Sequence, residues 1–498
     1  MSTWPFLSLL IWIPIVGSAL VMACHARVAR WVCLIIAVSV LVASVMIAMA
    51  YNRSSFHVMQ FAEFHPWIPA FNIGYRLGVD GVALALIVVC ALSVLIAVLV
   101  AWGEQHARIN AYLAAFLLFE GLTIGLFSSA DAMLFYVFFE ASLIPIFLIL
   151  GVWGQAGGSR AALKYFIYNF AGALALLAAL IYLYSQSGSF NLSDLYRLTL
   201  TAREQSWLFF AFLFAFAIKL PLFLLHNWLP GAHRQATCAG SILIALKVGG
   251  YGLLRFNLPI VPDACHRYTA MVLALSLVAI IVAGLIAIWQ SDLPTMLAYS
   301  SIAQMGLVTL GLFSALPLAR DYGNQDAALL GLTGAMIQMM SNTIVSAALF
   351  AAVSCLAVRR QSLSMTAYGG VASQLPALAT AVLIFCLANC GLPGTSGFLG
   401  ELMVILASFQ TFPPLALGGA LILVIGAAYT LWFYRRVFFG VSSPDNRAVM
   451  ARLNQRELLV LGACASVVVA IGVFPRLVTD LMDSSMKQLV TQLTVIKH

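Results

Sequence analysis

The sequence is a succession of long apolar stretches separated by short polar segments. A helix that crosses a bilayer needs about 20 apolar residues, and inside lipid its backbone groups must be bonded within the protein. Only 8% of the residues are charged, whereas soluble domains have about 25%. These features predict an all-α polytopic membrane protein with about fourteen transmembrane helices. The predicted spans are 4–22, 28–50, 82–102, 111–129, 133–152, 161–184, 206–225, 236–254, 270–290, 295–313, 328–357, 375–408, 414–438 and 457–475.

Basic residues in the loops predict the orientation of the chain. Loops after odd-numbered spans carry thirteen lysines and arginines, and loops after even-numbered spans carry seven, although the latter include the two long loops at 51–81 and 185–205. Because basic loops stay in the cytoplasm, we expect the odd-numbered loops to be cytoplasmic. Both termini would then be periplasmic, in a bacterial inner (cell) membrane. The net charge of +8 is spread over short loops, which favours a lipid bilayer and no nucleic acid as partner.

The sequence gives no sign of a bound cofactor or metal. Most of the nine cysteines lie inside apolar runs, and none forms a CxxC pair. Such cysteines are typical of small buried hydrophobic residues rather than metal or cluster ligands. No polar segment is large enough to form a domain for a nucleotide, flavin or cluster.

Two spans are interrupted by helix breakers next to an ionisable residue. Span 7 contains Lys219 and Pro221, and span 12 contains the glycine-rich segment 391–397 followed by Glu401. Paired broken segments in corresponding positions are typical of inverted repeats around a transport site. We therefore predict two inverted five-helix repeats, spans 4–8 and 9–13. The predicted division is 1–110 for three peripheral helices, 111–255 and 270–438 for the repeats, and 439–498 for a cytoplasmic loop, helix 14 and a C-terminal tail.

Glu140 is a candidate partner for Lys219. It lies in the run Phe-Tyr-Val-Phe-Phe-Glu-Ala-Ser. Apolar neighbours favour the neutral form of a carboxyl group, whereas a nearby ammonium favours the charged form. The pair could exist joined or separated, as a proton pump requires. A static salt bridge is the alternative, but several ionisable residues within the membrane favour a function.

Two further ionisable residues are candidates for the same path. Lys247 precedes Gly249, Gly250 and Gly252, which permit close helix approach or local unwinding. It could release and regain a proton, or it could reach the interface as a snorkelling lysine. Glu401 could exchange protons with water on one side, and it could equally be a charge favoured by the dipole of the second half-helix.

Four polar residues are weaker candidates for the path. His226 and His233 lie between spans 7 and 8 and could feed protons inward, although histidines at interfaces are common. Gln304 and Asn342 lie inside spans 10 and 11. They can hold water or bond helices together, but they cannot change charge.

Several motifs resemble the antiporter-like subunits of respiratory complex I, the NADH–quinone oxidoreductase. They are the Glu140 run, Lys219-Leu-Pro with His226-Asn-Trp-Leu-Pro, Tyr299-Ser-Ser-Ile-Ala-Gln-Met-Gly, and Gly391-Leu-Pro-Gly-Thr-Ser-Gly-Phe-Leu-Gly-Glu401. The resemblance covers spans 4–13. A glutamate in broken span 12 is typical of the M (ND4) type, whereas the L and N types and the Mrp antiporters typically have lysine there.

The resemblance implies a role for each candidate residue. Glu140 and Lys219 would be the coupled pair, Lys247 the central relay and Glu401 the exit residue. The chain would translocate a proton while NADH is oxidised and quinone reduced elsewhere in the complex. NAD, FMN, iron–sulfur clusters and quinone are expected in other subunits. L-like and N-like subunits would be its neighbours, with a long lateral helix of the L-like subunit lying across it.

The sequence departs from the family pattern in its second half. Gln304 and Asn342 stand where relatives have histidine, Thr237 replaces a usual proline, and about three residues are missing before Lys247. Two alternatives therefore stay open beside a proton pump. One is a subunit of an Mrp-type cation/proton antiporter, and the other is a structural membrane-arm subunit with impaired pumping.

Overall fold

The computed structural model describes residues 5–53, 59–104, 106–440, 450–495 and 497. Arg447, one of the basic residues counted in the loops, lies outside the described residues. The helices are α1 (Phe6–Ala23), α2 (Ala26–Ala50), α3 (Gly81–Ala101), α4 (Ile109–Ser128), α5 (Ala132–Ala141), α6 (Leu143–Val152), α7 (Gly158–Ser187), α8 (Leu192–Leu195), α9 (Ala202–Lys219), α10 (Leu229–Gln235), α11 (Cys238–Ile244), α12 (Val248–Gly252), α13 (Leu258–Ile260), α14 (Pro262–Arg267), α15 (Thr269–Val278), α16 (Gly284–Trp289), α17 (Leu293–Arg320), α18 (Gln325–Arg360), α19 (Val371–Gln374), α20 (Pro376–Asn389), α21 (Ser396–Thr411), α22 (Pro413–Tyr434), α23 (Gln455–Val473) and α24 (Arg476–Leu493).

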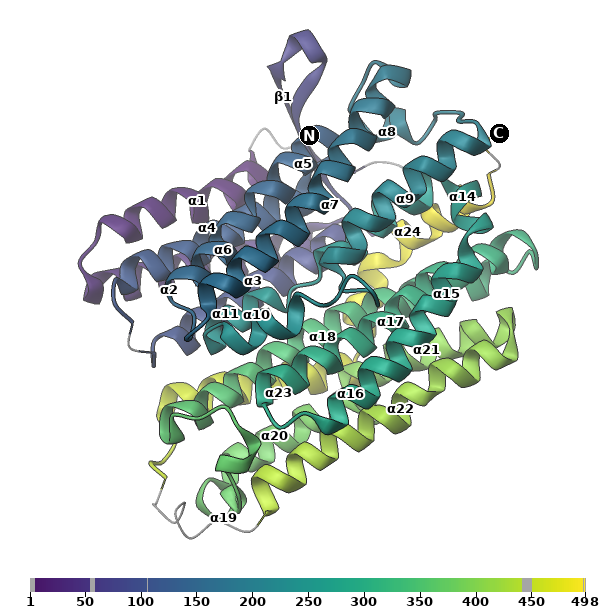
Figure 1. Cartoon of the computed structure of the whole chain (residues 1–498). Coiled ribbons are helices and arrows are strands. Elements are labelled where there is room, and N and C mark those ends of the chain that lie inside the picture. The colour runs from purple at the N-terminus through teal and green to yellow at the C-terminus, as the bar shows by residue number, and fades with distance from the viewer. Residues whose placement is uncertain (1–4, 54–58, 105, 441–449, 496, 498) are drawn as a thin grey trace.

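The long helices run side by side in one tilted bundle (Figure 1). Within the described residues, 12 helices are long and apolar enough to cross a membrane. The two other predicted spans coincide with α9 and with the pair α20 and α21. The helical membrane fold is thus confirmed. The count of fourteen spans, the inverted repeats and the domain boundaries stay predictions.

Burial divides the bundle into an inner and an outer set of helices. In the most hydrophobic 18 residues of the segment 238–260, and likewise of α17, 94% of the residues are buried inside the bundle. In those of α18, 89% are buried. In the corresponding parts of α1 and α2, only 33% and 28% of the residues are buried, so most of their apolar side chains face outward. The inner set carries Lys247, Gln304 and Asn342. A polar residue placed there lies among protein atoms rather than against lipid.

The loop at 51–81 contains strands, which the all-α prediction did not include. Strands β1 (Gln60–Ile68) and β2 (Ile73–Val79) form an antiparallel hairpin. Its turn ends at Asn72 in the left-handed conformation, with φ 51°. From β1, the Glu63 carboxylate accepts bonds from the first amides of α1, at 2.7 Å from Leu7 N. Because a carboxylate satisfies the free N–H groups of a helix start, the hairpin fixes the beginning of the bundle.

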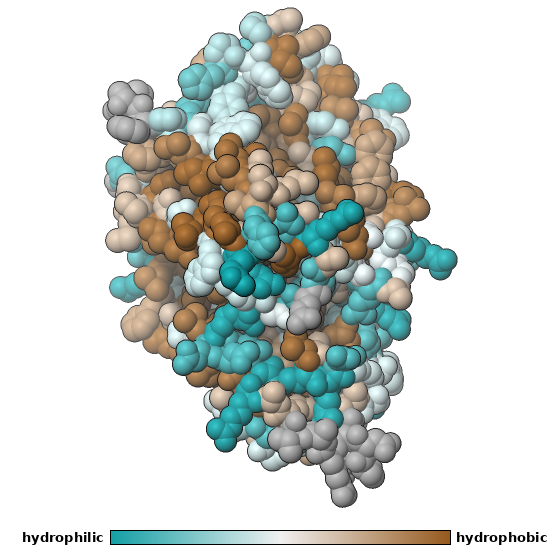
Figure 2. Space-filling view, turned by 90° about the vertical axis from the view of Figure 1, so that its left-hand side faces the viewer, coloured by the Kyte–Doolittle hydropathy of each residue, from teal (hydrophilic) through white to brown (hydrophobic). Residues whose placement is uncertain are grey.

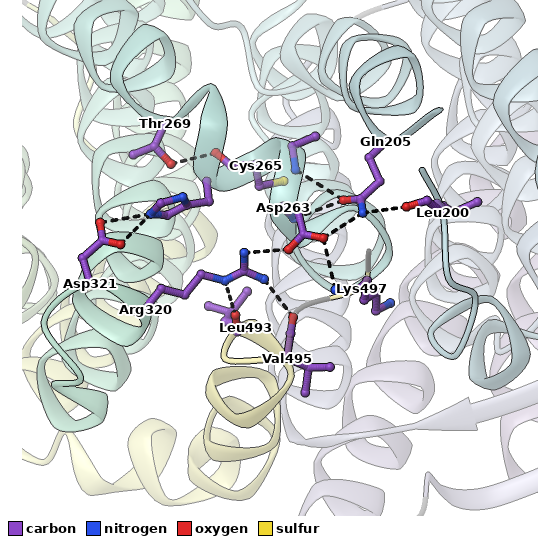
Figure 3. Close-up of polar contacts among 12 residues, drawn as sticks. Leu200, Gln205, Asp263, Cys265, Thr269, Arg320, Asp321, Leu493, Val495 and Lys497 are labelled. Atoms are coloured by element: carbon purple, nitrogen blue, oxygen red, sulfur yellow. Dashed lines mark hydrogen bonds and ion pairs between the residues drawn. The ribbon is translucent and has the colours of Figure 1, made fainter. Parts of the chain in front are cut away.

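The predicted C-terminal tail forms an additional helix, α24, which packs against α3, α17 and α18. Its end is held by Arg320 of α17, which donates to Leu493 O at 2.6 Å, Val495 O at 2.8 Å and the Asp263 carboxylate at 2.7 Å (Figure 3). The Lys497 amide donates to the same carboxylate at 3.1 Å. The end of α24 is therefore tied to α14 and α17.

The loops after spans 3, 5, 7, 9 and 11 meet at one end of the bundle, which we call the odd-loop end. Figure 2 views the molecule from the left of Figure 1 and shows hydrophilic side chains across the middle and lower part of this end. A hollow of about 940 Å³ opens here. Its lining comes from the loops after spans 3, 5, 7, 9 and 11, so these five loops converge on one place.

Candidate functional site

The first element of the site is the break between α9 and α10. Pro221 cannot donate a backbone hydrogen bond, and its ring clashes with a continuing helix. As a result α9 ends at Lys219 and the chain resumes helical form only at Leu229. The carbonyl of Ile218, freed by the break, accepts a bond from the Trp228 indole at 3.1 Å. The broken span 7 predicted from the sequence is confirmed.

Lys219 and Glu140 lie at the same break. The Lys219 Nζ donates to the Ser142 hydroxyl at 3.4 Å and lies 4.8 Å from the centre of the Phe139 ring. Ser142 interrupts span 5 between α5 and α6. Glu140, two residues earlier, is close enough for its charge to interact with that of Lys219, but the two groups form no direct ion pair. A static salt bridge is therefore not what the structure contains.

A second break lies in span 8, at Lys247. The helix α11 ends at Ile244, and α12 begins at Val248. Lys247 is 2% exposed and its Nζ has no hydrogen-bond partner. The ammonium is thus buried, unlike a snorkelling lysine. The sequence predicted that span 8 could unwind at its glycines. In the structure the helix is interrupted just before these glycines.

The glycines after Lys247 let span 8 approach the break in α9. A Cβ atom at Gly249 would lie 2.3 Å from the Phe216 carbonyl oxygen, and one at Gly252 would lie 2.2 Å from the Phe216 ring. Only glycine permits such an approach of backbone to backbone. The two lysine-bearing breaks therefore fit directly against each other.

The third break separates α20 from α21, and Glu401 follows it. Glu401 is 1% exposed. Its Oε1 accepts from the amide groups of Gln304 at 3.0 Å and Gln338 at 3.1 Å. Its Oε2 has no hydrogen-bond partner and faces Gly391 of the break. The broken span 12 is confirmed, and Glu401 belongs to a buried polar network rather than to the first turn of α21.

The network around Glu401 continues through Gln304 to Asn389, at the end of α20. The Gln304 amide also donates to the carbonyl of Asn389 at 3.2 Å. The Asn389 amide in turn donates to Ser300 and Thr430, each at 3.0 Å. In the described part of the chain, no hydrogen bond joins Lys247 to this network. Gln304 therefore bonds Glu401 but makes no hydrogen bond to Lys247.

The remaining candidates lie at different places around the breaks. His233 is 1% exposed, stacks on Phe350 at 4.8 Å between ring centres, and lies near enough to Lys247 for their charges to interact. His226 stacks on Phe223 at 5.2 Å within the α9–α10 break. Asn342 accepts from Ser301 at 3.0 Å. His233 is therefore buried against α18, whereas Asn342 bonds α18 to α17.

Two residues of the site were not singled out from the sequence. Gln338 binds Glu401, and Lys164 donates to Asn227 O at 2.8 Å within the α9–α10 break. Gln338 is four residues before Asn342, so it lies on the same face of α18, and this spacing could have identified it. Lys164 gave no such signal in the sequence. Among the described residues, no group of three metal-ligating side chains is present.

The site lies within the part of the chain that matches a known family. The family model described as NADH:quinone oxidoreductase/Mrp antiporter, TM, matches residues 129–426. The chain belongs to this family. The matched range contains Glu140, Lys219, Lys247 and Glu401, each of which lies at or near a helix break.

Individual relatives agree with the family match. The chain is 38% identical to NADH-quinone oxidoreductase subunit M of Rhodobacter capsulatus, over 93% of this chain and 91% of that one. It is also 38% identical to NADH-ubiquinone oxidoreductase chain 4 of Arabidopsis thaliana, over 88% of this chain and 87% of the relative. The resemblance to the M-type antiporter-like subunits is confirmed.

Solved structures give the same fold. A chain of respiratory complex I from Thermus thermophilus superposes with a TM-score of 0.88 at 29% identity, covering 98% of this chain and all of that one. A chain of the Mrp complex from Dietzia sp. DQ12-45-1b superposes at 0.84, with 20% identity over 99% of this chain and 98% of its own. The latter likeness shows the shared fold alone.

Proposed function

We propose that this chain is the M-type proton-translocating subunit in the membrane arm of an NADH:quinone oxidoreductase. The observation that carries the proposal is the coincidence of three helix breaks with Lys219, Lys247 and Glu401, of which Lys247 and Glu401 are buried. A buried ionisable group is costly in a membrane. Irregular backbone at membrane depth is tolerated where protein or a water-filled cavity surrounds it. Both features are expected of a proton path.

The first step of the proposed path is the loose Glu140–Lys219 pair. The Lys219 ammonium is held by a neutral hydroxyl and an aromatic face, which are weaker partners than a carboxylate. Movement of Lys219 toward or away from Glu140 changes the charge that each group experiences, and a proton can be released or bound accordingly. Lys247 then acts as relay, and Glu401 exchanges the proton at the far break.

The proposal places the chain among other subunits of the enzyme. NADH oxidation and quinone reduction take place elsewhere in the complex, where NAD, FMN, iron–sulfur clusters and quinone bind, and L-like and N-like subunits are the neighbours. The odd-loop end faces the cytoplasm of a bacterium, and both termini face the periplasm. The thirteen basic residues in the odd-numbered loops, against seven in the even-numbered loops, support this orientation.

The test uses the assembled complex reconstituted in lipid vesicles. We expect Lys219→Ala and Glu140→Ala each to lower the number of protons moved per electron, with assembly preserved on native gels. Lys487→Ala is the matched control, because Lys487 is an exposed lysine paired with Asp483 on α24. Normal translocation in both variants would refute the proposal.

A structural subunit with impaired pumping is the second candidate. Two observations favour it: Lys247 lacks a partner, and Gln304 and Asn342 are already engaged with other residues. The double variant Gln304→His with Asn342→His distinguishes the two readings. A rise in protons per electron would favour the impaired subunit, whereas an unchanged ratio would favour an intact pump. Sodium exchange by vesicles that contain the wild-type complex would instead support an Mrp-type antiporter.

A further inference from the structure

A pocket of about 370 Å³ lies at the other end of the bundle, and the proposed proton path does not use it. Its lining comes from the loops after predicted spans 2, 4, 6 and 8 and from α24, and we call it the even-end pocket. Figure 1 shows the hairpin and α8, two contributors to the lining, at this same end. Because these spans end here, the pocket lies where helices leave the bilayer and lipid headgroups begin.

Three charged residues line the even-end pocket, namely Arg76, Asp80 and Arg255. Asp80 and Arg255 form an ion pair, and their side chains are 15% and 11% exposed. Asp80 also accepts from the Ala83 amide at 2.9 Å, at the start of α3. Arg255 also donates to the Tyr251 hydroxyl at 3.1 Å. These two charges neutralise each other, so Arg76 leaves the lining with one net positive charge.

The Arg76 guanidinium is available to a ligand. Arg76 lies on β2 opposite Phe64 of β1, and its Cζ is 4.8 Å from the centre of the Phe64 ring. Among the described residues it forms no hydrogen bond or ion pair. The charge of Asp131 interacts with that of Arg76. The Asp131 carboxylate, however, accepts from the amides of Met133 and Leu134 at 2.9 and 3.1 Å. A guanidinium has five N–H donors, so Arg76 can bind a further acceptor.

The helix α24 contributes further donors to the pocket. Ser484, Gln488 and Gln492 line it, and their four-residue spacing places them on one face of the helix. Ser484 is 3% exposed, and its hydroxyl has no hydrogen-bond partner among the described residues. A buried hydroxyl without a partner costs free energy. A ligand that accepts a hydrogen bond from Ser484 would remove this cost.

These donors indicate the chemistry of the ligand. The only carboxylate in the lining, that of Asp80, is already bonded, so the pocket offers a cation and hydrogen-bond donors to an anion. Arginine with hydroxyl and amide donors suits a phosphate group, which accepts in several directions. Leu77, Leu254 and Leu489 supply an apolar part of the lining. Pockets of about 300–1,000 Å³ hold ligands larger than a bare ion.

We propose that the even-end pocket binds the phosphate group of an anionic phospholipid, with Arg76 and Ser484 as donors to its oxygens. The leucines contact the glycerol end of the lipid. Binding joins the hairpin, which carries Arg76, to α24, which carries Ser484. Inorganic phosphate offers the same oxygens and is the other source of such a ligand. A pocket that holds only water is the competing explanation.

The experiment follows the reaction of a thiol in the pocket with a water-soluble maleimide. Gln488→Cys places the thiol, and the complex is purified from native membranes and freed of lipid in dodecyl maltoside, which contains no phosphate. Mass spectrometry of the peptide that spans position 488 gives the labelling rate. Phosphatidylglycerol at about ten times its dissociation constant should slow labelling about ten-fold. Diacylglycerol with the same acyl chains lacks the phosphate and should leave the rate unchanged.

Variants in the Gln488→Cys background test the two donors. Arg76→Gln should weaken the binding of phosphatidylglycerol at least about ten-fold, as for loss of a hydrogen bond to a charged group. Ser484→Ala removes only one hydroxyl, so it tests the site even if Arg76→Gln does not assemble, and it should weaken binding by a smaller factor. Arg197→Gln is the matched control, because Arg197 is exposed in the loop after span 6 and does not line the pocket.

Each outcome bears on the proposed site. Equal slowing by inorganic phosphate would support the site and assign the free anion as its ligand. Unchanged labelling with both phosphate-bearing probes would overturn the inference, as would equal slowing by diacylglycerol. Protection that persists unchanged in Arg76→Gln, or that Arg197→Gln weakens as much, would also overturn it. None of these variants alters Lys219 or Glu140, so the proposed function stands or falls separately.

Discussion

Replacement of Gly249 by alanine tests whether the fit between the two lysine-bearing breaks is required for function. The added Cβ would lie 2.3 Å from the Phe216 carbonyl oxygen and 2.5 Å from the Leu220 amide nitrogen. These two atoms form the last hydrogen bond of α9, at 2.8 Å. Nonbonded atoms pack at about 3.5–4.0 Å, so the end of α9, including Lys219, must move by roughly 1 Å.

The expected energy follows from two opposing effects. Overpacking a core costs about 1–3 kcal/mol. The cost here lies at the upper end of this range, because backbone atoms cannot rotate out of the way. Alanine in place of glycine within a helix returns about 0.5–1 kcal/mol. We expect a net destabilisation of about 2–2.5 kcal/mol. A displacement of 1 Å at a reacting group can lower a rate about 100-fold, so proton translocation should fall far more than stability.

The assay is the rate of proton translocation by the complex in vesicles, with thermal unfolding of the purified complex as the second readout. Gly231→Ala is the matched control, because no atom lies within 4 Å of the Cβ that it would gain. We expect Gly231→Ala to behave as wild type. If Gly249→Ala were as stable and as active as Gly231→Ala, the reasoning that the breaks support each other would be refuted.

Two further predictions concern the second half and the C-terminal segment. Glu401→Leu removes the acceptor shared by Gln304 and Gln338 and leaves two buried N–H groups without a partner; at about 1–3 kcal/mol each, thermal unfolding should show a loss of stability of about 2–6 kcal/mol. Glu401→Gln keeps an acceptor, so this variant should assemble but translocate protons poorly. Equal stability of the two variants would contradict the hydrogen bonds assigned to Glu401. Burial lowers the pKa of Lys497 to about 8, so docking of the C-terminal segment disfavours the charged form of this lysine. Docking should therefore strengthen by up to about 3 kcal/mol as the pH rises from 8 to 10.5. Protection of the Leu493 region from proteolysis would show this strengthening, and a weakening over the same range would refute the prediction.

The sequence alone determined the helical membrane fold and the family. Both depend on signals that are local along the chain: the length of an apolar stretch sets whether a helix spans a bilayer, and proline or repeated glycines set where a helix stops. For this reason the breaks near Pro221 and in 391–397 could be placed without coordinates. The break at Ser142 was not predicted, because the single proline that follows it lies inside the next helix, α6.

Only the tertiary structure decided which partners the buried charges have. Lys219 bonds Ser142 rather than Glu140, Glu401 bonds Gln338 as well as Gln304, and Lys247 bonds no side chain. Such pairings require helices that are distant in the sequence to meet at one depth in the membrane and with one rotation about their axes. The hydrophobic periodicity of the sequence does not specify either quantity. The packing of α24 against α3, α17 and α18 follows the same rule, since it is formed by contacts between separate segments. The sequence thus determined where spans 7 and 12 break, and packing determined what each broken end touches.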